Sequence, residues 1–257
     1  MGVFSSGGVG LDLGSANITI CLENEGIVLR EPIYVLALRE DTEEVLGVGR
    51  DARQMLGRTP KDVVLLSPVM DGAIADIDQA TLLMKALSEK ALGKKRALEK
   101  NRLVVSMSTA ATRVEHAAAS AAVRGAGAKH AALIRSTIAA AIGAGLSIEE
   151  AKGVMVVLIG GSTTEVTVLS MNGVVAARTS RSGSLSMDEA IMRYVRREKG
   201  LIIGQRTAED LKIDIGSARM RGAKLTMDAY GRSLVSGLPR AVRVSSEEMI
   251  EALDEPL

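Results

Sequence analysis

Apolar and polar positions along residues 153–175 predict two strands joined by a glycine-rich turn and followed by a hairpin turn. Residues 155–159 form an uninterrupted apolar run, which is typical of a strand buried on both faces. Gly160-Gly161-Ser162-Thr163-Thr164 interrupts the run, and residues 165–169 then alternate polar and apolar, as a half-buried strand does. Asn172-Gly173 is a strong hairpin signal, so a third strand is expected after it.

The turn at 160–164 has the composition of a phosphate-binding turn, because glycine lets main-chain N–H groups approach a ligand and serine and threonine add hydroxyl donors. A plain β-meander with a flexible corner explains the same residues, and such glycine turns are the commoner class. Residues 9–22 repeat the design: an apolar strand ends in the turn Gly14-Ser15-Ala16-Asn17, with Asp12 beside it, and a second strand follows. Two such units in one chain favour two related halves that face one another across a phosphate ligand.

The remaining pattern predicts an α/β protein. Helices are expected at 49–56, 77–92, 112–125, 137–143 and 187–199, with a further helix opened by Thr207 as N-cap and a last one capped by Ser245. Strands are expected within 27–48 and at 63–66, 103–108, 131–134, 225–227 and 233–235, the last two on either side of a turn at Tyr230-Gly231. Residues 145–153 are the expected boundary between two lobes.

Composition excludes several classes of function. Hydrophobic residues make up 47% of the 257 residues but aromatic residues only 2%, so an aliphatic core is expected and a base-stacking nucleic-acid module is not. The net charge of +1 gives no overall field that would select a polyanion. One cysteine, Cys21, excludes an internal disulfide, and His116 and His130 are too few for a histidine-based metal site. Without a membrane-spanning apolar run or a signal-peptide core, a cytoplasmic protein is expected.

Two segments are candidates for contact with a membrane surface. The basic segment 93–102 is most simply a solvated loop, and contact with acidic lipid is the alternative. Val3 and Phe4 are the large apolar residues near the N-terminus, and burying two side chains in lipid contributes only a few kcal/mol. Weak binding of the monomer to liposomes is therefore expected.

Segments spread over nearly the whole chain match one family closely. They read LDLGSAN at 11–17, LGRTP at 56–60, DGAIAD at 71–76, AAAIGAGL at 139–146, IGGSTTEV at 159–166, IGQRTAEDLKIDIGSA at 203–218 and SGLPRAVRVSSEE at 236–248. On these segments the chain resembles the MreB family, the bacterial actin homologues that maintain rod shape. The length of the segments at 203–218 and 236–248 makes the resemblance specific.

The resemblance implies an α/β fold of the actin-like bilobed class, in which nucleotide lies between two ribonuclease-H-like cores. The first lobe is expected at 1–146, with a small subdomain at about 32–75, and the second at 147–257, with a small subdomain at about 181–243. The family continues beyond this chain into a glycine-rich adenine-binding turn and a closing helix. The second lobe is therefore expected to be incomplete, with exposed apolar faces around 154–169 and a tendency to self-associate.

The resemblance also implies a site for ATP with Mg²⁺, in which Asp12 is the metal-side residue. The two turns are expected to hold the phosphates, and a helix segment to contact ribose and adenine. The expected phosphate-side residues are Asp12, Gly14, Ser15, Ala16, Asn17, Gly160, Gly161, Ser162 and Thr163, and the residues expected near ribose and adenine are Glu209, Asp210, Leu211 and Lys212.

Departures from the family pattern affect the chemistry of that site. They are Leu158 for an aspartate that helps hold the magnesium shell, Ser162 for a third glycine, Arg135-Ser136-Thr137 for a glutamate pair and a proline, and Gly183-Ser184-Leu185-Ser186 for a Gly-Gly pair followed by acidic residues. One glutamate of that pair positions the attacking water in the family, and hydrolysis needs both a metal and a group that orients water. An arginine can stabilise transition-state charge, but no neighbouring residue replaces the lost carboxylate. A decayed catalytic site is expected.

The expected function is that of an MreB-like cytoskeletal protein in cell-shape maintenance, which binds nucleotide weakly and has lost hydrolysis. Its expected partners are further copies of itself, other MreB-type subunits and membrane-associated cell-wall synthesis proteins, in the cytoplasm or at the inner face of the cell membrane. An active, ATP-hydrolysing filament protein is the alternative from the enzyme class, and the missing carboxylates at 135, 136 and 158 argue against it. A chaperone-like or scaffold member of the actin/sugar-kinase superfamily is a third reading, against which the segments at 203–218 and 236–248 argue.

Overall fold

The computed structural model describes residues 7–93, 97–220 and 222–257. It divides into two compact units, a first unit of Met1–Arg181 and a second unit of Ser182–Leu257. Val3, Phe4 and the basic residues 94–96 lie outside the described residues, so the expectation of weak liposome binding stays a prediction. Within the described ranges, no helix has the length and apolar composition needed to cross a membrane.

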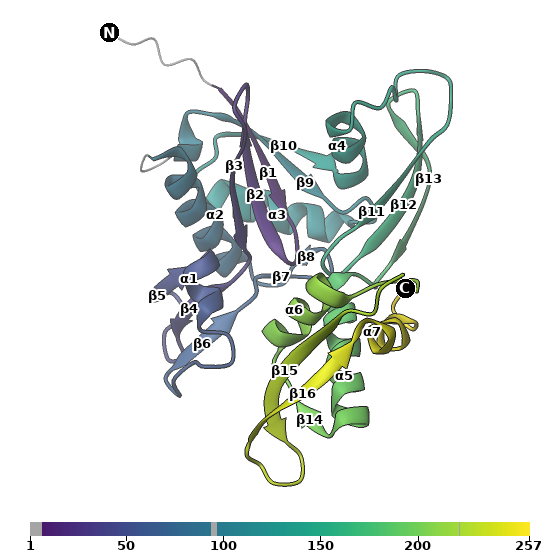
Figure 1. The fold of residues 1–257 in the computed structure, drawn as a ribbon. Coiled ribbons are helices and arrows are strands. Elements are labelled where there is room, and N and C mark those ends of the chain that lie inside the picture. Colours follow the sequence, from purple (N-terminus) through teal and green to yellow (C-terminus); the bar gives the residue numbers. More distant parts are fainter. Residues whose placement is uncertain (1–6, 94–96, 221) are drawn as a thin grey trace. The chain divides into compact units, whose positions relative to one another are not determined.

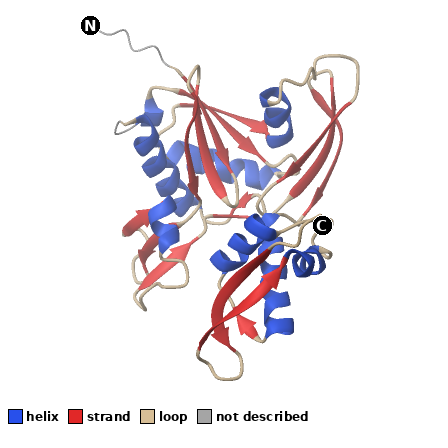
Figure 2. Ribbon diagram, in the orientation of Figure 1, coloured by secondary structure: helices blue, strands red, loops and turns tan. Residues whose placement is uncertain are grey.

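The first unit is built around a five-stranded sheet with the order β10-β9-β1-β2-β3 (Figures 1 and 2). β1, β9 and β10 run parallel, whereas β1, β2 and β3 form an antiparallel meander. In chain order the strands are β1 (Gly8–Leu13), β2 (Asn17–Leu22), β3 (Gly26–Pro32), β9 (Arg102–Met107) and β10 (His130–Arg135). Helices α2 (Ile77–Leu92) and α3 (Arg113–Gly125) contribute to its aliphatic core, in which Ile20, Leu83 and Val105 are fully buried.

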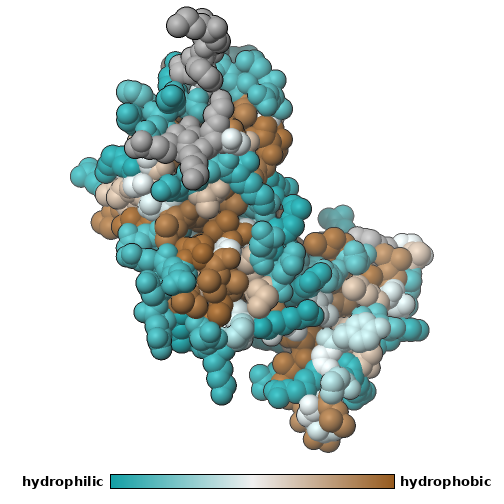
Figure 3. Space-filling view, turned by 90° about the vertical axis from the view of Figure 1, so that its left-hand side faces the viewer, coloured by the Kyte–Doolittle hydropathy of each residue, from teal (hydrophilic) through white to brown (hydrophobic). Residues whose placement is uncertain are grey.

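Shorter elements of the first unit fall within residues 32–99. The strands β4 (Val35–Leu38), β5 (Val45–Val48) and β6 (Val63–Leu66) form a sheet in the order β5-β4-β6, β7 (Val69–Met70) pairs with β8 (Ala73–Ile74), and α1 (Gly49–Gln54) and the 3₁₀ helix η1 (Ala97–Glu99) complete the set. Val35 and Ala37 are fully buried, whereas Leu46 on β5 is 49% exposed. In the space-filling view from the left-hand side of Figure 1, apolar residues gather at the surface of the first unit (Figure 3).

A second sheet of the first unit is covered on one face only. Its antiparallel strands β11 (Val154–Ile159), β12 (Thr164–Ser170) and β13 (Gly173–Ser180) follow one another, and α4 (Ser136–Gly143) lies on one side of them (Figure 1). On the other face, Met155, Val157 and Ile159 are 65%, 55% and 62% exposed. The prediction that β11 is buried on both faces is therefore wrong, and the exposed apolar face around 154–169 agrees with the expectation from the resemblance.

The position of these three strands differs from the expected lobe division. They are expected in a second lobe that begins at 147, whereas the compact first unit includes them. The reason is α4, which contacts β9 and β10 of the five-stranded sheet as well as β11 and β12. The division at 146 and the two small subdomains stay predictions.

The second unit has its own core. β14 (Leu201–Ile202), β15 (Thr226–Ser233) and β16 (Pro239–Ser245) form an antiparallel sheet in that order. The helices α5 (Ser184–Lys199), α6 (Gln205–Ile215) and α7 (Ser246–Leu253) contact one another, and all three also contact the sheet. Their apolar faces supply the fully buried Ile191, Val195, Leu211 and Met249, which pack with Leu201 and Val244 of the sheet.

Three predictions for the second unit are wrong. The strand expected at 233–235 is absent, because β15 ends at Ser233 and a turn follows. Thr207 is not an N-cap, because α6 begins at Gln205 with Gly204 in the N-cap position. Tyr230 and Gly231 form no turn, since both lie inside β15 and pair with β16. A Cβ atom at position 231 would lie 2.2 Å from the carbonyl oxygen of Ile202 on β14. Glycine is needed there for the close approach of two strands, and the sequence signal of such a glycine is the same as that of a turn.

The stability of the first unit is expected to depend on pH through one buried carboxylate, that of Glu31. Glu31 is 5% exposed and accepts hydrogen bonds from the main-chain N–H of Arg50 at 2.7 Å and from Lys90 Nζ at 2.9 Å. Burial raises the pKa of Glu31, but the hydrogen bonds and positive charges of Lys90 and Arg50 outweigh it and hold that pKa below the usual value. A carboxylate whose pKa is lowered by folding stabilises the fold above its unfolded pKa.

We therefore expect the free energy of unfolding to fall as the pH drops below about 4.5, through the lowered pKa of Glu31. In Glu31→Gln, this part of the pH dependence should disappear, and the neutral-pH stability should be lower by about 1–3 kcal/mol because a charged hydrogen-bond network is weakened. Urea unfolding between neutral and acid pH measures both quantities. Glu40→Gln, at an exposed carboxylate, is the control, and an equal pH slope in the two variants would contradict the assignment to Glu31.

Candidate phosphate-binding site

The two glycine-rich turns of the first unit close in the same way. Between β1 and β2, the N–H of Gly14 donates to the carbonyl oxygen of Asn17 at 3.1 Å. Between β11 and β12, the N–H of Gly160 donates to the carbonyl oxygen of Thr163 at 2.8 Å. Each bond spans three residues, so the repeated design that the sequence suggests is present in the backbone.

The structure also brings the two turns into direct contact. Ser162 Oγ donates a hydrogen bond to Ser15 Oγ at 2.7 Å. Gly161 packs on the other turn so closely that a Cβ atom added to it would lie 2.9 Å from Cβ of Ala16 and 3.0 Å from the Ala16 nitrogen. Any larger residue at position 161 would have to push the turns apart.

A third segment that sequence reasoning did not assign to the site joins them. The N–H of Gly72 donates to Ser15 Oγ at 3.1 Å, and Gly72 has a φ of +76°, which favours glycine. A Cβ atom at position 72 would lie 3.5 Å from Cβ of Ser108 and 3.6 Å from Cγ2 of Thr163. The Asp-Gly turn signal was visible in the sequence, but its distance from the other turns along the chain hid the contact. Three segments therefore converge on the hydroxyl of Ser15, which is 8% exposed.

The donors at this junction fit an anionic group. A hydroxyl accepts two hydrogen bonds and donates one, so Ser15 keeps its own proton for a further acceptor. Four main-chain N–H groups of the two turns have no acceptor within the described ranges; they belong to Ser15, Ala16, Gly161 and Ser162. Successive N–H donors of this kind form concave sites for phosphate. The residues present therefore fit the phosphate part of a nucleotide.

Few acidic side chains of the described residues are available to a metal ion at this site. Asp12 is exposed and accepts a hydrogen bond from Ser106 Oγ, its neighbour in the parallel β1–β9 ladder. In the part of the chain that the structure describes, no three His, Cys, Asp or Glu side chains form a group that could hold a metal ion. Mg²⁺ is often held by one or two carboxylates together with substrate phosphates and water. Among the described residues that the resemblance assigns to the metal side, Asp12 is the carboxylate that could support a magnesium ion held mainly by phosphate and water.

The positions at which the resemblance implies carboxylates have other contacts. Leu158 on β11 pairs directly with Glu165 on β12. Arg135 is exposed at the end of β10 and forms no side-chain cap on α4. Ser136 Oγ donates to Glu165 Oε2 at 2.8 Å, and the fully buried Thr137 has its Oγ1 2.7 Å from Oγ1 of Thr109. Sequence reasoning missed Glu165, although the alternation of β12 places it on the buried face with Thr167 and Leu169.

The residues expected near ribose and adenine lie in the second unit and are described by themselves. All four are on α6, where Leu211 is fully buried in the core and Glu209 and Asp210 are half-buried. Lys212 Nζ contacts Asp188 Oδ1 at 2.6 Å and the carbonyl oxygen of Ser184 at 2.8 Å. Lys212 therefore joins α6 to α5 through a largely buried ion pair, and the role of this helix segment in nucleotide binding stays a prediction.

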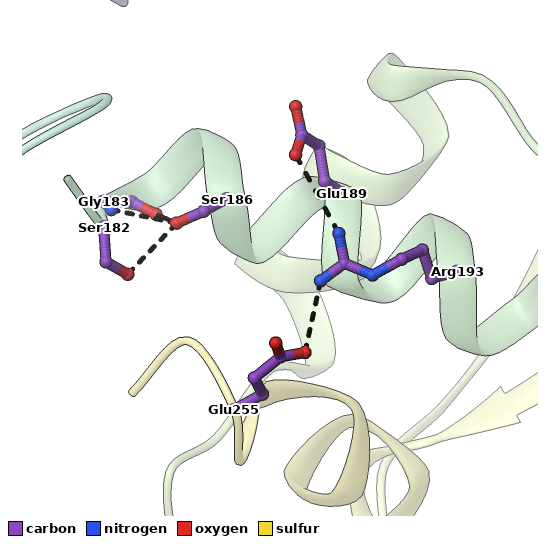
Figure 4. Close-up of polar contacts among 6 residues, drawn as sticks. All are labelled: Ser182, Gly183, Ser186, Glu189, Arg193 and Glu255. Atoms are coloured by element: carbon purple, nitrogen blue, oxygen red, sulfur yellow. Dashed lines mark hydrogen bonds and ion pairs between the residues drawn. The ribbon is translucent and has the colours of Figure 1, made fainter. Parts of the chain in front are cut away.

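The beginning of α5 is held by serine hydroxyls where the family has acidic residues. Ser186 Oγ accepts from the N–H of Gly183 at 2.9 Å and lies 3.2 Å from Ser182 Oγ (Figure 4). Further along the helix, Arg193 contacts Glu189 at 3.9 Å and Glu255 at 3.4 Å (Figure 4). These ion pairs are exposed and contribute little to stability. The first turn of α5 contains serine hydroxyls and no acidic residue.

Comparisons with known proteins show which family this chain is similar to. A family model described as MreB/Mbl protein matches residues 6–257. The cell shape-determining protein MreB of Escherichia coli (strain K12) is 43% identical over 260 residues, covering 100% of this chain and 74% of that protein. The cell shape-determining protein Mbl of Bacillus subtilis (strain 168) is 40% identical over 247 residues, covering 96% and 74%.

Solved structures give the same fold. The crystal structure of MreB5 of Spiroplasma citri bound to ADP superposes with a TM-score of 0.91 at 30% identity, covering 98% of this chain and 75% of that one. A second structure of that protein, bound to AMPPNP, gives the same values. The MamK double helical filament matches with a TM-score of 0.76 at 16% identity, over 96% of this chain and 75% of that one, which speaks for the fold alone. The actin-like fold expected from the sequence is confirmed.

Proposed function

The chain belongs to the MreB/Mbl family, and we propose from this that it is an actin-like cytoskeletal protein with a role in cell-shape maintenance. We propose further that it binds an adenine nucleotide weakly through the two turns of the first unit and has lost most or all hydrolysis. The observation that carries the nucleotide proposal is the convergence of three segments on Ser15, with unused main-chain donors on both turns. MreB5 of Spiroplasma citri, which this chain resembles in fold, was crystallised with ADP and with AMPPNP.

Weak binding follows from what each side of the site supplies. Main-chain donors are independent of the side chains that depart from the family pattern, so phosphate recognition is kept. Mg²⁺, when bound, neutralises phosphate charge, and Asp12 alone supports it from the protein because Leu158 offers no oxygen. Hydrolysis also needs a group that orients water, and Arg135 and Ser136 supply no carboxylate.

Partners and location are proposals of the same kind. The exposed apolar face of β11–β13 supports self-association, and membership of the family supports assembly with other MreB-type subunits and with membrane-associated cell-wall synthesis proteins. The proposed location is the cytoplasm, including the inner face of the cell membrane. The balanced charge and the few aromatic residues support the expectation that nucleic acid is not a partner.

The close contact of Gly161 with Ala16 gives a direct test of the site. Gly161→Ala is expected to weaken binding of a fluorescent ADP analogue about 10- to 100-fold, because the added Cβ forces the turns apart. Gly143→Ala is the matched control, since a Cβ there meets no atom within 4 Å. Titrations with ADP and AMPPNP on the unmodified chain establish the reference affinity.

Two results would count against the proposal. If the unmodified chain binds neither nucleotide at millimolar concentration, the nucleotide part of the function is wrong. If Gly161→Ala binds as tightly as the unmodified chain, the nucleotide lies elsewhere.

A further inference from the structure

Glu165 is a buried carboxylate to which neither the sequence nor the family comparison gives a role. It is 3% exposed and lies on β12, two residues after the second phosphate turn ends at Thr163. Among the described residues no lysine, arginine or histidine forms an ion pair with it. A buried charge is costly unless hydrogen bonds compensate for the lost water, so its neighbours must stabilise it.

Three features of its surroundings do so. The main-chain N–H of Thr109 lies 3.3 Å from Oε1 and 3.1 Å from Oε2 of Glu165, and Ser136 Oγ donates to Oε2 at 2.8 Å. Ser136 is the first residue of α4, a helix with no acidic residue in its first turn and no side-chain cap. The N-terminal end of a helix favours a negative charge, and α4 has none in its first turn. Glu165 on β12 supplies that charge.

The groups that bind Glu165 belong to segments that border the phosphate site. Thr109 follows the carboxyl end of β9, one residue after Ser108, which lies beside Gly72 and Thr163. Thr109 Oγ1 is also 2.7 Å from Oγ1 of Thr137, so the loop after β9 is bound to α4 twice. A single carboxylate therefore joins β12 to the loop after β9 and to the start of α4.

We propose that Glu165 is a positioning residue of the phosphate site. Its hydrogen bonds fix β12, and with it the turn at 160–163, in the place where Gly161 meets Ala16 and the donors of both turns face one ligand. The inference rests on the proposed function, since the ligand is the adenine nucleotide of that proposal. Because a phosphate is anionic, the negative charge of Glu165 opposes binding, and its contribution comes from the hydrogen bonds.

The two contributions are separated by two substitutions. Glu165→Gln keeps an acceptor for Thr109 and a partner for the Ser136 hydroxyl but removes the charge, so affinity for a fluorescent ADP analogue should stay within about threefold of the unmodified chain. Glu165→Ala removes both bonds and should weaken binding about 10-fold or more. Ser136→Ala should have a smaller effect, and none when it is added to Glu165→Ala, because the two residues share one interaction.

Glu31→Ala is the matched control, because Glu31 is a second buried carboxylate of the same unit whose partners, Arg50 and Lys90, lie outside the site. It should lower the midpoint of thermal unfolding and leave the affinity unchanged. Thermal unfolding of every variant identifies those that are folded at the temperature of the titration.

Hydrogen exchange of the nucleotide-free proteins gives a readout that does not depend on binding. The amides at 160–164 should exchange faster in Glu165→Ala than in the unmodified chain, and at the original rate in Glu165→Gln. Unchanged exchange in Glu165→Ala, or equal affinity of Glu165→Ala and the unmodified chain, would overturn the positioning role. A loss of affinity in Glu165→Gln equal to that in Glu165→Ala would overturn it too, since the charge would then be the contribution. Failure of the unmodified chain to bind nucleotide removes only the proposed function, because the exchange rates still decide the role of Glu165.

Discussion

A chain that carries both Leu158→Asp and Arg135→Glu is expected to hydrolyse ATP about 100-fold faster than the unmodified chain, or more. The two substitutions restore the acidic residues that the family resemblance implies on the metal side and at the attacking water. A positioned base is worth roughly 10²–10⁴ in rate and electrostatic preorganisation roughly 10²–10³. The two factors need not multiply, because groups that act together are not additive.

One of the two substitutions, Leu158→Asp, is expected to lower the stability of the fold. Leu158 pairs directly with Glu165, so both side chains lie on the same face of the sheet, and Asp at 158 places a second carboxylate beside a buried one. Like charges at that separation destabilise each other and raise the pKa of one of them. Leu158→Asp alone should therefore lower the midpoint of thermal unfolding, and Mg²⁺ with nucleotide should restore part of the loss. Leu158→Asn, which has nearly the same shape without the charge, is the control.

Steady-state phosphate release from the unmodified chain, the two single variants and the double variant measures the effect. Turnover by the unmodified chain at the rate of the Escherichia coli MreB that it resembles would show that the catalytic site is intact. If the double variant binds nucleotide but hydrolyses it no faster than the unmodified chain, the missing carboxylates are not what limits hydrolysis.

Helix boundaries could be predicted from the sequence where a local signal marks them. The bounds 77–92 predicted for a helix are those of α2, which Asp76 caps and which ends at Gly93 in the left-handed conformation. Ser245 and Glu248 form the capping box at the start of α7, as expected. These signals are contacts within one turn of helix, so they depend on residues close together in the sequence.

Predictions for strands were wrong where an element distant in the sequence determines the structure. Gly231 looks like a turn residue, and only the approach of β14 shows that it lies inside β15. The exposed face of β11 could not be seen in its apolar run either, because the sequence does not say which elements cover a sheet.

The candidate site was predictable in its parts and not in its assembly. Each glycine-rich turn could be found from its composition, and their repeated design led us to expect that they face one another. The contact between Gly161 and Ala16 could not be foreseen, because it joins segments far apart in the chain. Gly72 and Glu165 were missed for the same reason. Alternation places Glu165 on the buried face of β12, yet it does not show that this face meets the start of α4.

The unmodified chain is expected to associate with itself through the exposed face of β11–β13. This face carries Met155, Val157 and Ile159 of β11. It also carries two residues of β12, since Val166 pairs with Val157 and Val168 pairs with Met155. β11 carries no charged side chain and is an edge strand of its sheet, and exposed apolar edges of this kind promote pairing with another chain. Arg178 of β13 pairs with Val166 and therefore lies on the same face, on the side away from the edge strand β11.

The expected association is weak, and one substitution should remove it. Partial burial of three such side chains on each of two copies contributes about 4–10 kcal/mol, which is close to the cost of about 4–15 kcal/mol for association. Sedimentation velocity at rising protein concentration should therefore show a shift from monomer to larger species, and Val157→Lys should abolish it by placing a charge in the middle of the edge strand β11. Val114→Lys, at a 79% exposed position on α3, is the control and should associate as the unmodified chain does. A monomer at the highest concentration reached, or equal association of Val157→Lys and the unmodified chain, would show that this face is not the contact.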